Sequence, residues 1–144
     1  MSHQIIKLSD SQDLINYLNE VDCDFGIPLS SKVSIASFAN KLLAYGNVYV
    51  VKYNNEFVSC IGFYCNDTIN QIAHLPILST KTIARGKGFA RLLINKMIDE
   101  CTQRGMKCIL CDSINPSAIA IYKSIGFFEY DKDGDKSFLK YIID

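Results

Sequence analysis

The stretch that decides the predicted fold is "ARGKGFARLL", residues 84–93, in which two glycines flank a lysine directly before an apolar helical pattern. Backbone N–H groups at the start of a helix have no intrahelical acceptor and lie at the positive end of the helix dipole. Because Gly86 and Gly88 lack a Cβ, a ligand can approach those N–H groups closely. A turn of this kind between a strand and a helix predicts a binding site for phosphate or pyrophosphate.

Two common phosphate-binding patterns do not fit this loop. A Walker loop requires Ser or Thr after its lysine to hold magnesium, but Gly88 follows Lys87. A dinucleotide fingerprint requires a third glycine where Arg91 stands, and the acidic residue expected about 20 positions later is not obvious. A nucleotide-binding module is therefore a disfavoured alternative. The pattern that the loop does satisfy is R-x-x-G-x-A, with Arg85, Gly88 and Ala90.

A second motif follows one predicted helix and one predicted strand later, in "NPSAIAIYKSIGF" (115–127). With these two motifs at this separation, the chain resembles the GCN5-related N-acetyltransferases, the GNAT superfamily. That family carries R/Q-x-x-G-x-G/A at its acyl-CoA pyrophosphate loop and N-x-x-A-x-x-x-Y-x-x-x-G-F downstream. The resemblance covers roughly residues 47–143, and the first 45 residues match only in having a strand and two helices. The second pattern is matched by Asn115, Ala118, Tyr122, Gly126 and Phe127.

The periodicity of the chain predicts an α/β domain with a mixed central sheet of about seven strands and about four helices. The expected order is one strand, two helices, three strands, a helix, a strand, a helix and a final hairpin. Ser9 with Gln12 forms a capping box for the first helix, Ser30 or Ser31 caps the second, and Gly46 ends it. The expected strands are 3–8, 47–53, 56–65, 69–80, 107–114 and the hairpin strands that begin near 127 and 137; the later helices are about 89–104 and 115–125.

The strand–helix–strand unit at 69–112 should be a right-handed crossover between two parallel strands, with the glycine loop at its strand-to-helix turn. Pro76 lies inside the first of these strands and cannot donate a ladder hydrogen bond. A bulge or a one-sided edge is expected there. The resemblance implies a GNAT-like fold in which these parallel strands splay apart at the cofactor site.

Bulk properties indicate one globular domain over residues 1–144, because the hydrophobic fraction is 49%. The formal net charge is zero, which gives no general attraction to nucleic acid or to an anionic membrane. No segment reads as a signal peptide or as a membrane span, and a cytoplasmic location with reduced cysteines is expected. Cys108 and Cys111 should point to opposite faces of a strand, so no metal site is predicted.

The resemblance implies direct transfer of an acetyl group from acetyl-CoA to a primary amine, without a metal. It also implies that the pantetheine arm of the cofactor pairs with free backbone groups at the end of the splayed strand, at Leu78, Ser79 and Thr80. The pyrophosphate would lie on the loop, and Asn115 would also contact the cofactor. The loop residues expected to bind are Arg85, Gly86, Lys87, Gly88, Phe89 and Ala90.

Catalysis requires a proton donor for the leaving thiolate and a route for removing a proton from the amine. Tyr122 matches the family tyrosine that points at the thioester sulfur, and a phenol is protonated at neutral pH. His74 on the strand before the loop is a candidate base, weighed evenly against a structural role, because many relatives use ordered water instead. Asp112 and Ser113 are weaker candidates for contacting the acceptor.

The acceptor class stays open: a small metabolite, an amino sugar or a protein N-terminus would each supply a primary amine. Aromatic residues near 25–29, 45 and 64 are candidates for lining an acceptor pocket. A non-catalytic acyl-CoA-binding or sensor domain is the alternative function, against which the retained Tyr122 argues. Family members are often dimers, so a homodimer is among the assemblies considered.

Overall fold

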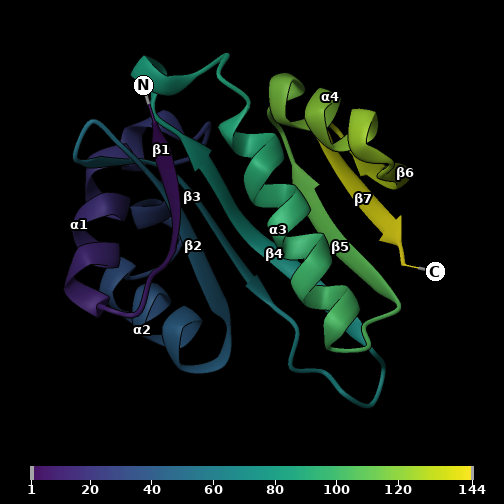
Figure 1. Cartoon of the computed structure of the whole chain (residues 1–144). Helices are drawn as coiled ribbons and strands as arrows, with labels where there is room; N and C mark the ends of the chain where they lie inside the picture. Colours follow the sequence, from purple (N-terminus) through teal and green to yellow (C-terminus); the bar gives the residue numbers. More distant parts are fainter. Residues whose placement is uncertain (1, 144) are drawn as a thin grey trace.

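A computed structural model of the chain, which describes residues 2–143, contains one mixed sheet of seven strands in the order β1-β2-β3-β4-β5-β7-β6 (Figure 1). Four α-helices flank it. The strands are β1 (His3–Lys7), β2 (Asn47–Tyr53), β3 (Glu56–Tyr64), β4 (Ile72–Thr80), β5 (Cys108–Ser113), β6 (Phe128–Asp133) and β7 (Lys136–Ile142). The helices are α1 (Ser11–Val21), α2 (Ile35–Tyr45), α3 (Phe89–Gln103) and α4 (Pro116–Ile125). This is the predicted order of elements, and it confirms the predicted α/β fold class.

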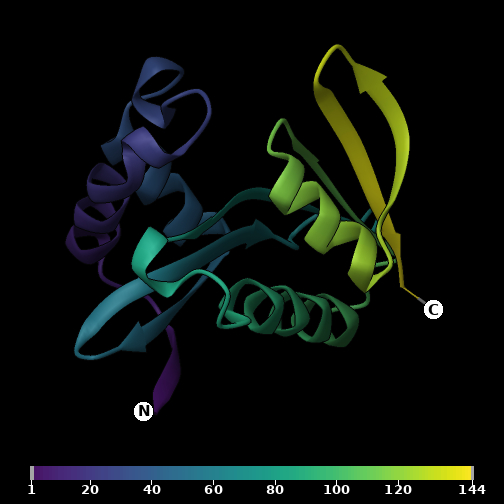
Figure 2. The same cartoon turned by 90° about the horizontal axis from the view of Figure 1, so that it is seen from above.

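The functional geometry begins where β4 and β5 separate. These two strands form the one parallel pair within the described sheet, with register from Ile72 opposite Cys108 to Leu75 opposite Cys111. Pairing with β5 stops there, although β4 continues to Thr80 and pairs with β3 to its end. Figure 2 shows the two halves of the sheet diverging on either side of this separation. The last five residues of β4 therefore have no strand partner on the β5 side.

Pro76 lies at the point where the strands part. On the β3 side, Gly62 pairs with Ile77 but Tyr64 pairs with His74, so two β4 residues stand opposite one β3 residue. This is a β-bulge, which relieves the ladder of the hydrogen bond that proline cannot donate. The bulge predicted from the sequence is confirmed.

Each face of the sheet is covered by a separate pair of helices. On one face, α3 and α4 cover a core that includes Leu93, Met97 and Ile109, all fully buried. On the other face, α1 and α2 cover a second core around Leu14 and Leu42. The first core spans both sides of the gap, since it includes Ile61 of β3 as well as Ile109 of β5, so it holds the two halves of the sheet together while β4 and β5 separate.

The expected turns are confirmed where glycine or asparagine adopts a positive φ. Asn54 and Asn55, with φ of 52° and 62°, close the β2–β3 hairpin, as a two-residue primed turn requires. Gly105 has φ of 78° and ends α3, because the N–H of Met106 returns to the carbonyl of Cys101 at 3.0 Å. No helix within residues 2–143 combines the length and the apolar character needed to cross a bilayer.

Several predicted boundaries were wrong. Asp10, not Ser9, caps α1, because its carboxylate accepts the N–H of Asp13 at 3.0 Å. Ser34 caps α2, because residues 29–31 form a separate short 3-10 turn instead of the helix start. The strand expected from residue 69 begins at Ile72, after a turn in which Asp67 accepts the N–H of Asn70 at 2.9 Å.

Candidate active site

The glycine loop presents an open row of backbone donors. Gly86 and Gly88 adopt left-handed φ angles of 80° and 83°, and a Cβ built on either would meet no atom within 4 Å. Gly88 caps α3 without any side-chain hydrogen bond. Within the described chain, no backbone or side-chain acceptor takes the N–H groups of residues 86–91. This row therefore fits a multiply charged anion such as a diphosphate.

Three cations surround the row, and each is positioned by a neighbour. Arg85 donates from Nε to the carbonyl of Thr80 at 3.1 Å, which ties the loop to the end of β4. Lys87 holds its Nζ 5.5 Å from the centre of the Tyr53 ring. Arg91 donates to Ser124 Oγ at 2.8 Å and so links α3 to α4. None of the three forms an ion pair with a carboxylate of residues 2–143, so their charge is available to a bound anion.

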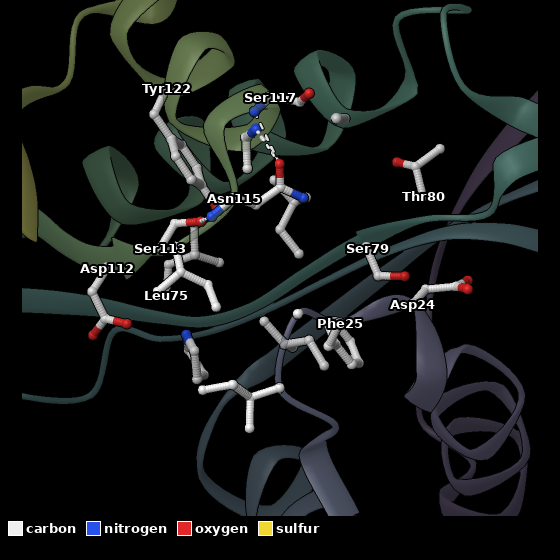
Figure 3. A pocket seen from close by; sticks show the side chains of 18 of the residues that line it. Asp24, Phe25, Leu75, Ser79, Thr80, Asp112, Ser113, Asn115, Ser117 and Tyr122 are labelled. Carbon is white, nitrogen blue, oxygen red and sulfur yellow. Dashed lines mark hydrogen bonds between the residues drawn. The ribbon is translucent and has the colours of Figure 1, made fainter. Parts of the chain in front are cut away.

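A pocket of about 400 Å³ connects this loop to the opposite side of the sheet through the gap between β4 and β5 (Figure 3). One wall is the unpaired end of β4, and the other is the end of β5 with the start of α4. The segment between α1 and α2 forms the far wall. The lining residues are Asp24, Phe25, Gly26, Ile27, Leu29, Lys32, Leu75, Pro76, Ile77, Leu78, Ser79, Thr80, Arg85, Ala90, Asp112, Ser113, Ile114, Asn115, Ser117, Ala118, Ile121, Tyr122 and Lys136.

Tyr122 projects from α4 into this pocket, as Figure 3 shows. Only 4% of its surface is exposed, and its ring packs on Phe127 with centroids 5.2 Å apart. Burial raises the pKa of the Tyr122 hydroxyl far above its usual value, and the charges of Cys111 and Asp112 raise it further. The hydroxyl is consequently protonated at every physiological pH, which suits a proton donor.

Asn115 sits on the pocket wall as the cap of α4. Its Oδ1 accepts the N–H groups of Ser117 at 2.9 Å and Ala118 at 3.4 Å, and Pro116 fills the first helical position. Its own N–H donates to Ser113 Oγ at 3.0 Å. These bonds fix the turn between β5 and α4 and thereby the direction in which Tyr122 points. The structure assigns Asn115 this capping role beside any contact with a cofactor.

The predicted cofactor-binding residues of β4 line the pocket, but the side chain of Phe89 does not. Leu78, Ser79 and Thr80 all face the gap from which β5 has separated. Phe89 is 4% exposed and packs against Tyr53, so its side chain belongs to the core. Only the backbone N–H of Phe89 is free for a ligand.

His74 is not brought to the pocket. It is exposed on β4 and pairs in register with Tyr64 and Leu110, on the fully paired side of the bulge. The pocket lining contains no histidine and no glutamate. Its carboxylates are Asp24 and Asp112, and the latter lies 3.7 Å from Lys136 Nζ.

Part of the pocket was not anticipated from the sequence. Phe25 lines it as expected, but Tyr45 and Tyr64 do not. The unexpected residues include Asp24, Lys32, Ile114 and Lys136. They lie in loops or at strand ends, where no periodicity marks them, and only the folded sheet brings them together.

Comparison with known proteins agrees with this geometry. The model of the acetyltransferase (GNAT) family matches residues 15–127. A GNAT-family acetyltransferase from Staphylococcus aureus Mu50 has a TM-score of 0.81 at 19% identity, over 99% of this chain and 100% of that chain. The ribosomal-protein-S18-alanine N-acetyltransferase of Escherichia coli has a TM-score of 0.77 at 19% identity, over 99% and 95%.

A third similar structure is the PaiA N-acetyltransferase of Thermoplasma acidophilum in complex with coenzyme A, with a TM-score of 0.77 at 19% identity over 99% and 100% of the two chains. A search of curated proteins by sequence found no significant match. At identities this low, the structural likeness establishes the fold alone, and the family model carries the assignment of the family.

Proposed function

We propose, from the premise that this chain belongs to the GNAT acetyltransferase family, that it transfers an acetyl group from acetyl-CoA directly to a primary amine. One observation carries the proposal: the unpaired N–H row at residues 86–91 adjoins a pocket that Arg85 and Ala90 line together with the end of β4 and Tyr122. Gly86, Lys87 and Gly88 lie outside that lining, next to it in the chain. A diphosphate site, an exposed strand edge and a proton donor are the three features that an acyl-CoA transferase needs, and here they lie side by side.

The glycine loop would bind the cofactor. Acetyl-CoA, when bound, supplies the reactive thioester. The free N–H groups around Gly86 and Gly88 would hold its diphosphate, with Arg85, Lys87 and Arg91 adding positive charge. The edge of β4 that β5 leaves uncovered at residues 78–80 would exchange hydrogen bonds with the amide groups of the pantetheine arm, as a neighbouring strand would, although the Thr80 carbonyl already accepts Arg85 Nε.

Tyr122 supplies the proton. Burial keeps the hydroxyl protonated, so that it can donate a hydrogen bond, and with it a proton, to the thiolate as the bond between carbon and sulfur breaks. The amine must lose a proton before it attacks, and the lining offers two carboxylates for this, Asp24 and Asp112. With no histidine in the lining, we propose that the proton leaves through water toward Asp112, which already influences the pKa of Tyr122.

We place this chemistry in the cytoplasm, where all six cysteines, free within the described structure, stay reduced.

The experiment is a measurement of coenzyme A release from acetyl-CoA in the presence of a panel of primary amines, with mass spectrometry of the product. Acetylated amine and stoichiometric thiol release are expected. The competing function, an acyl-CoA-binding domain without turnover, is favoured by the absence of histidine and glutamate from the lining. Tight acetyl-CoA binding with no amine acetylated above the rate of hydrolysis would establish that competing function instead.

A further inference from the structure

A second hollow of about 860 Å³ lies next to the pocket described above, between α4 and the β6–β7 hairpin. Ile27 and Ile114 line both hollows, so the two share a common boundary. The residues that line the outer hollow are Ile27, Ile114, Pro116, Ile119, Ala120, Lys123, Glu129, Lys132, Asp135 and Ser137.

The boundary between the two hollows is apolar and comes from two distant parts of the chain. Ile27 is 49% exposed and Ile114 is 39% exposed, although both are large hydrophobic residues. The segment that carries Ile27 touches Ile114 directly, since a Cβ on Gly26 would stand 2.8 Å from Ile114 Cδ1. We call Ile27 and Ile114 the isoleucine seam. An apolar group that crosses from one hollow to the other would shield this seam from water.

Beyond the seam, the outer hollow has an apolar floor and a charged rim. Ile119 and Ala120 come from one side of α4, and Lys123 lies one turn further along the helix. Across from them, Glu129 of β6 accepts the Ser137 hydroxyl at 2.6 Å. Charges of both signs around an apolar floor suit a peptide, which has alternating donors, acceptors and side chains.

The charges of the inner pocket leave one carboxylate available to a cationic terminus. The lining carries Asp24 and Asp112 beside the cations Lys32, Arg85 and Lys136, and Lys136 lies 3.7 Å from Asp112. Asp24 forms no ion pair within residues 2–143, so an ammonium group is attracted to it before it loses its proton. The remainder of such an acceptor can leave past the isoleucine seam, because Ile27 and Ile114 border both hollows.

We propose that the acceptor is the N-terminal amine of a peptide, with an apolar side chain on the seam directly after the amine-bearing residue and the following residues in the outer hollow. This inference rests on the proposed acetyl transfer and narrows its acceptor class. A small amine would fill only the inner pocket and leave the seam and the larger outer hollow in water.

The test compares four acceptors by kcat/KM for coenzyme A release: alanine amide, the amides of Ala-Leu-Gly-Gly and Ala-Asp-Gly-Gly, and hexylamine. Ala-Leu-Gly-Gly amide is expected to exceed alanine amide and the Asp peptide by about tenfold, because one well-placed apolar group discriminates at that level. Equal values for alanine amide and the two peptides, or a higher value for hexylamine, would overturn the inference while leaving acetyl transfer intact. No release with any of the four would count against acetyl transfer itself.

Two variants locate the effect. Ala120→Trp would fill the outer hollow and is expected to remove the advantage of the Leu peptide, with alanine amide changed by no more than about twofold. Ile114→Ser is expected to lower kcat/KM for the Leu peptide more than for the Asp peptide. Ala36→Trp is the matched control, because Ala36 is exposed on α2 and lines neither hollow. Unchanged peptide preference in Ala120→Trp, with acetyl-CoA affinity intact, would contradict the assignment of the outer hollow to the peptide.

Discussion

The hydroxyl of Tyr17 lies 3.0 Å from Oγ of Ser79, which joins α1 to the unpaired end of β4. Tyr17 is 2% exposed, and burial raises the pKa of its hydroxyl well above the usual range, so it stays protonated. Two residues beyond Ser79, Lys81 forms an ion pair with Glu20 of the same helix at 2.8 Å. The strand edge proposed to hold the pantetheine arm is thus fixed by a helix on the other face of the sheet.

Tyr17→Phe should test that relationship. Loss of one part-buried hydrogen bond is expected to lower the free energy of unfolding by about 1 kcal/mol, measured by urea denaturation. Because β4 would be less firmly placed, KM for acetyl-CoA should rise while kcat is retained. Tyr45→Phe is the control, since Tyr45 is 64% exposed. A fall in kcat with unchanged KM would show that Tyr17 acts on the chemistry and not on the position of the strand.

Tyr122→Phe should separate catalysis from binding. Removal of a general acid is expected to lower kcat by about 100-fold, while the dissociation constant for acetyl-CoA stays nearly the same. Tyr130→Phe, an exposed position on β6, serves as the matched control. If steady-state kinetics gave the same kcat for Tyr122→Phe and the unaltered protein, Tyr122 would have no part in proton transfer.

The placement of His74 predicts that it is dispensable. His74→Ala is expected to keep kcat within about twofold, because the side chain is exposed and outside the pocket lining.

Asp112→Asn, which removes a carboxylate from the lining, should lower kcat/KM at neutral pH. Both variants are compared with the unaltered protein at one neutral pH, and a large loss of kcat in His74→Ala with none in Asp112→Asn would reverse the two assignments.

Alkaline stability should depend on Tyr49. Burial, and then its hydrogen bond to Glu100, raise the pKa of Tyr49 from 10.0 to about 12. A raised pKa of the folded state contributes stability that is complete below pH 10 and is lost as pH rises toward 12. Tyr49→Phe should therefore show a shallower decline in the free energy of unfolding over that window. An identical slope in urea titrations of Tyr49→Phe and exposed Tyr130→Phe would contradict this.

The sequence predicted the elements whose local chemistry is decisive. Gly86 and Gly88 could be placed at the start of α3 because two glycines before an apolar helical pattern have few other structural uses. Pro76 could be placed at a bulge because proline cannot complete a ladder. Tyr122 followed from the motif that matches the family, and its helix cap and stop are both encoded locally by Asn115 and Gly126.

What the sequence did not predict depends on distant contacts. Whether His74 faced the pocket depended on the register between β4 and β5; Pro76 indicates an irregularity nearby but not on which side of it His74 lies. Ile27 and Ile114 meet only after the sheet has formed, and each alone resembles an ordinary loop residue. The bond between Tyr17 and Ser79 likewise joins residues 62 positions apart. Such pairs require the tertiary fold to be known first.

The central claim is that the N–H groups around Gly88 hold the diphosphate of coenzyme A. Its most direct test is the dissociation constant for acetyl-CoA, by calorimetry, of Gly88→Glu against Gly105→Glu. Both glycines have left-handed φ angles, 83° and 78°, and open space at the Cβ position, at opposite ends of α3. Both substitutions thus impose similar backbone strain, but only the first places a carboxylate among the proposed phosphate donors. We predict that Gly88→Glu loses detectable binding and Gly105→Glu keeps it; equal affinity in the two variants would contradict the claim.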